Sequence, residues 1–171
     1  TGCFLLFNTG QKKVISKSGL VTTIACGESG EPVYALEGSI FIAGAAIQWL
    51  RDGLKIIRKA SASEKIAFSS KNDEEVIFIP AFTGLGAPYW RSDVRGAIFG
   101  LTRGTTRQMI VKSALDAIAF QVNDVFERMT QETGIQISSL KVDGGASRND
   151  YLMQLQSDLL RVPILRSRLS E

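Results

Sequence analysis

The sequence predicts an α/β protein, and three observations support this class. Short apolar segments separated by Gly, Asn and Pro turns fill the first third of the chain, as in antiparallel strands. Two later segments repeat their apolar residues at helical spacing. A strand, a glycine turn and a helix then follow one another. With 171 residues, of which 44% are hydrophobic and 22% charged, the chain can form one domain with a sizeable core.

The first third predicts four short strands, at residues 3–7, 14–15, 20–25 and 33–36. Turn-forming residues separate them, among them Gly10 and Gly19. We expect an antiparallel meander, in which each strand pairs with the next one along the chain.

The apolar residues then change to a helical period. Five of them follow at intervals of three or four residues: Ala43, Ile47, Leu50, Leu54 and Ile57. They predict a helix with one core-facing stripe. Gly44, Gln48 and Lys55 form a second stripe roughly 120° away, because each residue of a helix advances by about 100°. A narrow Gly/Gln stripe beside a core stripe can face a ligand.

The remaining elements follow from similar patterns. We expect a short helix at 63–68, strands at 76–79 and 97–100, and a long helix at 106–130. An irregular segment with two Pro and two Gly spans residues 80–90. Its aromatic side chains either clamp a ligand or pack the loop onto the body. A strand at 140–142, a helix with Ser147 as its N-cap, and a strand at 162–165 complete the chain.

Composition excludes several classes of function. The chain has no histidine, which removes a histidine general base, a Ser-His-Asp triad and a His-ligated metal. Cys3 and Cys26 are too isolated for a zinc site, and so few cysteines favour a reducing compartment such as the cytoplasm. The net charge of +3 is too small to indicate nucleic acid. No apolar run is long enough to span a membrane.

The turn Asp143-Gly144-Gly145 between a strand and a helix is the best chemical candidate. Glycines let the backbone approach a ligand, and a helix N-terminus offers N–H groups to phosphate oxygens. The alternative is a tight turn without a ligand, in which Asp143 caps the turn. Thr1-Gly2 leaves a similar choice between a phosphate contact and a plain turn.

Several segments together resemble a known family. The most specific is PAFTGLGAPYW at 80–90, and TGCFLLFNTG opens the chain. The matching segments are 1–10, 20–25, 34–38, 48–52, 80–90, 95–104 and 142–145. They resemble the glycerol kinases of the FGGY carbohydrate-kinase family, in the C-terminal, nucleotide-binding domain only.

This resemblance implies an actin-like, ribonuclease H-like fold with a mixed central sheet and helices on both faces. It also implies ATP- and Mg²⁺-dependent phosphorylation of glycerol to sn-glycerol 3-phosphate. Carried over by position, Thr1 contacts the terminal phosphate, and Gly44 and Gln48 line the nucleotide site. Gly145 approaches the phosphates and ribose, and Asn149 the adenosine. Phe4 is the one residue of this domain that contacts glycerol.

The same resemblance implies that residues 1–171 are a domain that is incomplete at both ends. The catalytic Asp of the family precedes the Thr-Gly-Cys strand, and the N-terminal domain carries the Mg²⁺-binding carboxylate and most glycerol contacts. We therefore expect no catalytic residue and no metal ligand in this chain, and no activity from it alone. The parent is expected to be a homo-oligomer, a dimer or a tetramer. The alternatives are another FGGY sugar kinase and a non-catalytic nucleotide-binding module.

Overall fold

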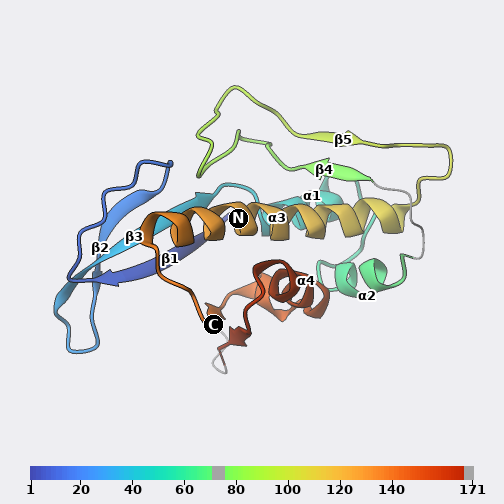
Figure 1. The fold of residues 1–171 in the computed structure, drawn as a ribbon. Helices are drawn as coiled ribbons and strands as arrows, with labels where there is room; N and C mark the ends of the chain where they lie inside the picture. The colour runs from blue at the N-terminus through green and yellow to red at the C-terminus, as the bar shows by residue number, and fades with distance from the viewer. Residues whose placement is uncertain (71–75, 168–171) are drawn as a thin grey trace.

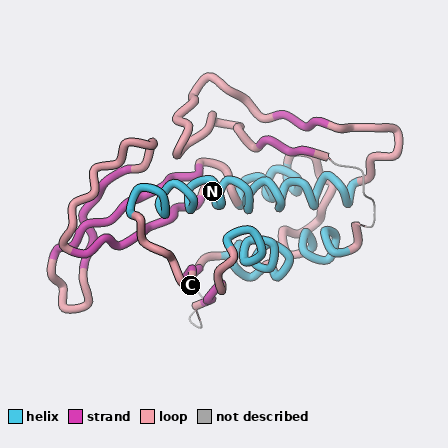
Figure 2. Tube along the Cα trace, viewed as in Figure 1, coloured by secondary structure: helices cyan, strands magenta, loops and turns pink. Residues whose placement is uncertain are grey.

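A computed structural model describes residues 1–70 and 76–167. The helix α3 (Arg107–Thr133) runs through the middle of the molecule (Figure 1). It contacts three other helices, α1 (Gly44–Asp52), α2 (Ala62–Phe68) and α4 (Asp150–Leu160). One end of α3 lies beside the N-terminal strands and the other beside α2, as the tube in Figure 2 also shows. The fold is therefore organised around one long buried helix.

The N-terminal sheet contains β1 (Cys3–Gly10), β2 (Val21–Cys26) and β3 (Pro32–Ile40). Its order is β1-β3-β2 and both pairings are antiparallel, so the expected sequential meander is wrong. The longest and most buried strand, β3, takes the centre, where both of its edges are paired. The expected strand at 14–15 is also wrong, since these residues belong to none of the described strands. The Val14 carbonyl accepts from the Thr22 hydroxyl at 2.6 Å.

The helix α1 is shorter than its apolar period suggests. It ends at Asp52, and Gly53 follows as its C-cap. Leu54 is exposed and Lys55 has a left-handed backbone with φ 57°, so neither continues the helix. Ile57 is nevertheless buried, after the chain has turned. Lys55 therefore leaves the second stripe, which reduces to Gly44 and Gln48.

Two smaller sheets complete the architecture. An antiparallel pair joins β4 (Ile77–Ile79) to β5 (Ala97–Phe99). A parallel pair joins β6 (Leu140–Val142) to β7 (Ile164–Arg166), through the 3₁₀ helix η1 (Gly145–Arg148) and α4. The mixed α/β class is confirmed, with the expected central sheet divided among three hydrogen-bonded sheets.

The long helix begins and ends with recognisable caps. The Thr106 hydroxyl accepts from the Met109 backbone N–H, and the Met109 sulfur accepts from the Thr106 N–H at 3.3 Å. Methionine thus occupies a capping-box position that usually holds Glu or Gln. Gly134, with φ 66°, ends the helix. The helix at 106–130 is confirmed and extends to Thr133.

The aromatic loop at 80–90 packs onto the body of the domain. Phe82 contacts the ring of Trp49 with centroids 5.0 Å apart. The Tyr89 hydroxyl donates to Asp124 at 2.9 Å, and the Trp90 indole N–H donates to the Gly19 carbonyl at 2.6 Å. These contacts favour the packing interpretation over a ligand clamp.

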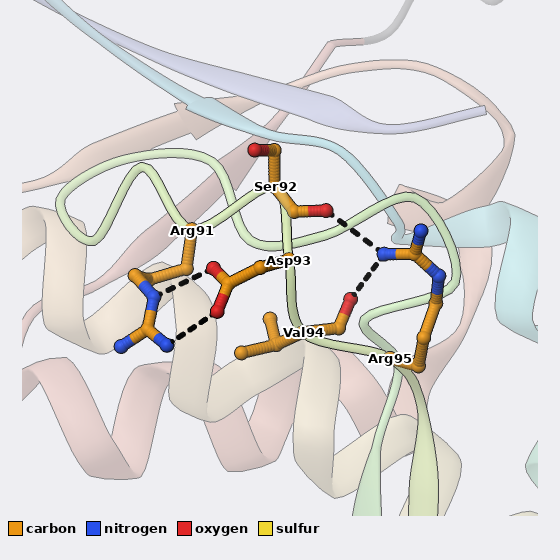
Figure 3. Close-up of polar contacts among 5 residues, drawn as sticks. All are labelled: Arg91, Ser92, Asp93, Val94 and Arg95. Carbon is orange, nitrogen blue, oxygen red and sulfur yellow. Dashed lines mark hydrogen bonds and ion pairs between the residues drawn. The ribbon is translucent and has the colours of Figure 1, made fainter.

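The segment after this loop is held by its own polar groups (Figure 3). The guanidinium of Arg91 makes a bidentate ion pair with Asp93, at 2.6 and 2.7 Å. Arg95 donates from one nitrogen to the carbonyl oxygens of Ser92 and Val94, both at 2.8 Å. The guanidinium groups of both arginines are thus engaged within the loop.

Within the described residues, no helix is both long and apolar enough to cross a membrane. The buried side chains form two clusters. One joins α1, α2, α3 and α4, and the other lies between α3 and the N-terminal sheet. Both clusters use α3, which thereby fixes α1 relative to β1.

Candidate functional site

The chain before β1 lies on the N-terminus of α1. This helix has no side-chain cap, because Ala43 occupies the N-cap position. The carbonyl oxygen of Thr1 instead accepts from the backbone N–H of Ala45 at 3.0 Å and of Ala43 at 3.3 Å. A Cβ added to Gly44 would lie 3.7 Å from the Thr1 hydroxyl oxygen. The structure thus brings together two predicted site residues, Thr1 and Gly44.

The glycine next to Thr1 has a structural explanation. A Cβ on Gly2 would lie 2.1 Å from the carbonyl oxygen of Ile40 and 2.8 Å from that of Phe41. No side chain fits there, because the backbone of Gly2 lies directly against the end of β3. This close approach holds the Thr1 backbone beside α1.

The two expected stripes are present as far as α1 extends, without Leu54, Ile57 and Lys55. Ala43, Ile47 and Leu50 are buried, whereas Gly44 is half-buried and Gln48 is exposed. Gly44 has no positive φ, and the nearest atom to an added Cβ is at ordinary contact distance. The fold therefore does not require glycine at this position, although glycine is the poorer helix former.

The turn after β6 contains two different glycines. Gly144 has φ 85°, a conformation that favours glycine, and its N–H donates to the Asp143 carboxylate at 2.7 Å. This bond supports Asp143 as a cap of the turn. Gly145 has no positive φ, and nothing lies within 4 Å of an added Cβ. Gly145 thus faces open space, and no contact in the described fold requires glycine at this position.

The helix α4 begins later than expected, and its N-cap is Asn149 rather than Ser147. The Asn149 side-chain oxygen accepts from the Leu152 N–H at 2.9 Å. Ser147 lies in η1, where its hydroxyl donates to the Gly144 carbonyl at 2.7 Å. The Ser147 prediction is wrong because the 3₁₀ turn η1 comes before the α-helix.

The structure also reveals a partner that the sequence did not suggest. The Asn149 amide nitrogen donates to the hydroxyl of Ser63 on α2 at 3.2 Å, across 86 positions of sequence. The backbone N–H of Asp150 donates to the carboxylate of Glu64. No motif in the sequence links these two segments, since the contact depends on how α2 and α4 pack.

Phe4 lies on the outer face of β1. Its side chain is 67% exposed, whereas its neighbour Leu5 is buried between the sheet and α3. Successive residues of a strand point to opposite faces, so Phe4 points away from α3 and pairs across the sheet with Ser39. Leu6 is exposed beside it. An aromatic side chain is therefore available to a ligand or a partner domain.

The predicted residues thus fall into separate groups. Thr1 and Gly44 meet, with Gln48 one turn along α1. Gly145 and Asn149 lie at the start of η1 and of α4. In residues 1–70 and 76–167, no hydrogen bond joins one group to the other, and no three acidic or cysteine side chains gather as metal ligands. Each group lies at the N-terminal end of a helical segment, of α1 for Thr1 and Gly44, and of η1 and α4 for Gly145 and Asn149.

Comparison with known proteins shows which family the chain belongs to. The model of the C-terminal domain of the FGGY family of carbohydrate kinases matches residues 1–171. The chain belongs to this family.

Within the family, the chain is similar to glycerol kinases. It is 58% identical to glycerol kinase of Lactococcus lactis over 98% of the chain, and 57% identical to that of Brevibacillus brevis over 100%. It spans 34%, about a third, of the length of both curated relatives.

Solved structures support the same placement. A crystal structure of Plasmodium falciparum glycerol kinase with ADP is 43% identical, with a TM-score of 0.90, and the match covers 99% of this chain and 34% of that one. A xylulose kinase from Lactobacillus acidophilus is 21% identical with a TM-score of 0.83, covering 100% and 34%, and shows the fold alone. The expected actin-like fold class is thereby confirmed.

Proposed function

We propose that this chain is the nucleotide-binding part of an enzyme that transfers the terminal phosphoryl group of ATP to glycerol. The products are ADP and sn-glycerol 3-phosphate. Relatives named glycerol kinase that match nearly the whole chain support this substrate, and the ADP in the Plasmodium falciparum structure supports the nucleotide.

The contact between Thr1 and Gly44 carries the proposal. It places a hydroxyl at a glycine whose missing side chain the fold does not require. Phe4 follows three residues later on the same extended segment, about 10 Å along it at roughly 3.3 Å per residue. A phosphate at Thr1 and a polyol near Phe4 would thus lie within reach of each other.

Phosphoryl transfer needs positioning and charge stabilisation more than covalent chemistry from the protein. In our proposal the Thr1 hydroxyl donates to the terminal phosphate, and Gln48 lines the site one turn from Gly44. Gly145 lets the backbone approach the phosphates and ribose, and Asn149 contacts the adenosine. The proton of the attacking hydroxyl goes to an Asp preceding Thr1 in the full-length enzyme.

Mg²⁺ would neutralise phosphate charge during the transfer. We propose that its protein ligand is the carboxylate that the resemblance to glycerol kinases places in the N-terminal domain. We further propose a cytoplasmic homo-oligomer, a dimer or tetramer. The free thiols of Cys3 and Cys26 support a reducing compartment.

A coupled assay on the full-length enzyme tests the proposal. We expect ATP-dependent turnover with glycerol, and much weaker turnover with xylulose and gluconate at equal concentration. Phe4→Ala should raise KM for glycerol more than KM for ATP. Preference for xylulose or gluconate would instead identify another sugar kinase. Nucleotide binding without turnover on any polyol would identify a non-catalytic module.

A further inference from the structure

The side chain of Ser63 joins α2 to the start of α4. It is only 1% exposed, and its hydroxyl both donates and accepts a hydrogen bond. The hydroxyl donates to the Ala60 carbonyl at 2.6 Å and accepts from the Asn149 amide nitrogen at 3.2 Å. A single buried oxygen thus connects the backbone before α2 to the cap of α4.

This link determines which way the Asn149 amide points. Its oxygen is committed to the Leu152 N–H as the helix cap, and one N–H of its nitrogen is committed to Ser63. Exchanging the two ends of the amide would lose the helix cap, because an amide nitrogen cannot accept from the Leu152 N–H. It would also turn the amide oxygen toward a hydroxyl that already donates to the Ala60 carbonyl. The second N–H makes no hydrogen bond to any described residue, and the side chain is half-buried.

The adjoining backbone is held by the same turn of α2. The carboxylate of Glu64 accepts from the Asp150 N–H, and Asp150 also pairs with Arg166 at 2.6 Å. Residues 149 and 150 are therefore anchored together on α2, and the amide of Asn149 has a defined position relative to the glycine turn.

We propose that Ser63 is a positioning residue for the nucleotide. It holds the Asn149 amide so that its remaining N–H is offered as a donor to an acceptor of the adenosine, a ribose oxygen or a ring nitrogen. This inference rests on the proposed function. Ser63 itself does not contact the nucleotide and acts through Asn149.

The test compares two buried serines in the full-length enzyme. Ser63→Ala should raise KM for ATP about three- to tenfold, as expected for one weakened hydrogen bond, and leave kcat and KM for glycerol within twofold. Ser113→Ala is the matched control. Ser113 is also buried, but its hydroxyl donates only to the Ile110 carbonyl at 3.0 Å within α3. A merely structural role would give both variants the same kinetics.

A second variant keeps the inference testable if Ser63→Ala does not fold. Asn149→Ser retains a good N-cap but removes the amide N–H, and it should raise KM for ATP to a similar or larger extent. Adding Ser63→Ala to Asn149→Ser should then cause no further rise, because both changes remove the same contact. Titration of each variant with ADP gives an independent readout of affinity.

The outcomes separate the two proposals. A parent value of KM for ATP in folded Ser63→Ala, in an enzyme that phosphorylates glycerol, overturns the positioning role alone. If Ser63→Ala does not fold, a parent value in Asn149→Ser overturns it in the same way. Additive rises in the double variant overturn it as well. An enzyme that turns over no glycerol contradicts the proposed function, and ADP affinity then still decides the role of Ser63.

Discussion

The carbonyl oxygen of Thr1 caps α1 by accepting from the backbone N–H of Ala45 at 3.0 Å. The first N–H groups of a helix have no partner within it, and Ala43 has no side-chain oxygen to supply one. The segment before β1 supplies that partner instead. The first turn of α1 therefore depends on where Thr1 lies. In our proposal, a phosphate bound at Thr1 would lie beside this end of the helix.

Gly44 provides the most direct test of this arrangement. Gly44→Leu should raise KM for ATP well above its parent value and change KM for glycerol less, because the larger side chain would fill the space beside Thr1. Steady-state kinetics of the full-length enzyme measures both constants. Gln48→Ala should act in the same direction but by tenfold at most, since it removes one polar contact worth roughly 0.5–1.5 kcal/mol.

Gly44→Ala is the control for this series. Its Cβ would meet the Thr1 hydroxyl oxygen at 3.7 Å, an ordinary contact, so the helix should gain up to about 1 kcal/mol of stability. Equal KM values for ATP in Gly44→Leu and the parent would show that the stripe is only surface. A large drop in the melting temperature of Gly44→Leu would show that this stripe is buried in the protein core.

The two glycines after β6 should respond oppositely to substitution. Gly145→Val should abolish nucleotide binding in isothermal titration and leave the melting temperature nearly unchanged, because its Cβ meets no atom within 4 Å. Gly144→Ala should destabilise the fold by about 1–2 kcal/mol, because alanine rarely adopts φ 85°. Unchanged ADP affinity in Gly145→Val would remove this residue from the site.

Glu132 should make stability depend on acid pH. Its carboxylate accepts from the Lys17 and Ser18 N–H groups and from the Ser16 hydroxyl, at 2.6–3.0 Å. Burial raises the pKa of Glu132, but these hydrogen bonds outweigh it and hold the pKa below its ordinary value of 4.5. The folded state thus favours the ionised form. This stabilisation is complete above about pH 4.5 and disappears as the pH falls through the lower folded-state pKa.

Urea unfolding at several pH values checks the role of Glu132. Glu132→Gln should cost about 1–3 kcal/mol at pH 7 and flatten the loss of stability below pH 4.5. Glu127→Gln serves as the control, because Glu127 is exposed and bonds only to Asn123 one turn earlier on α3. Equal pH profiles for the parent and Glu132→Gln would contradict the role of this carboxylate.

The 171 residues alone should not phosphorylate glycerol. They contain no histidine, and the resemblance to glycerol kinases places the general base before Thr1 and the metal carboxylate in another domain. ADP should bind weakly to the isolated chain. Glycerol- and ATP-dependent turnover by the purified 171 residues, above the level of a mock preparation, would disprove this expectation.

The features that depend on local periodicity could be predicted from the sequence. The buried stripe of Ala43, Ile47 and Leu50 and the exposed Gln48 follow from helical geometry alone, which needs no knowledge of distant contacts. The same holds for α2, for β6 and for most of α3. The family was also readable, because the loop at 80–90 carries a specific run of residues.

Features that depend on long-range packing could not be predicted from the sequence. The central place of β3 results from its pairing with both β1 and β2. The link from Asn149 to Ser63 spans 86 positions, and no spacing in the sequence encodes it. Short-range patterns predict which face of an element is buried, whereas the partner of a polar side chain depends on which element packs against it.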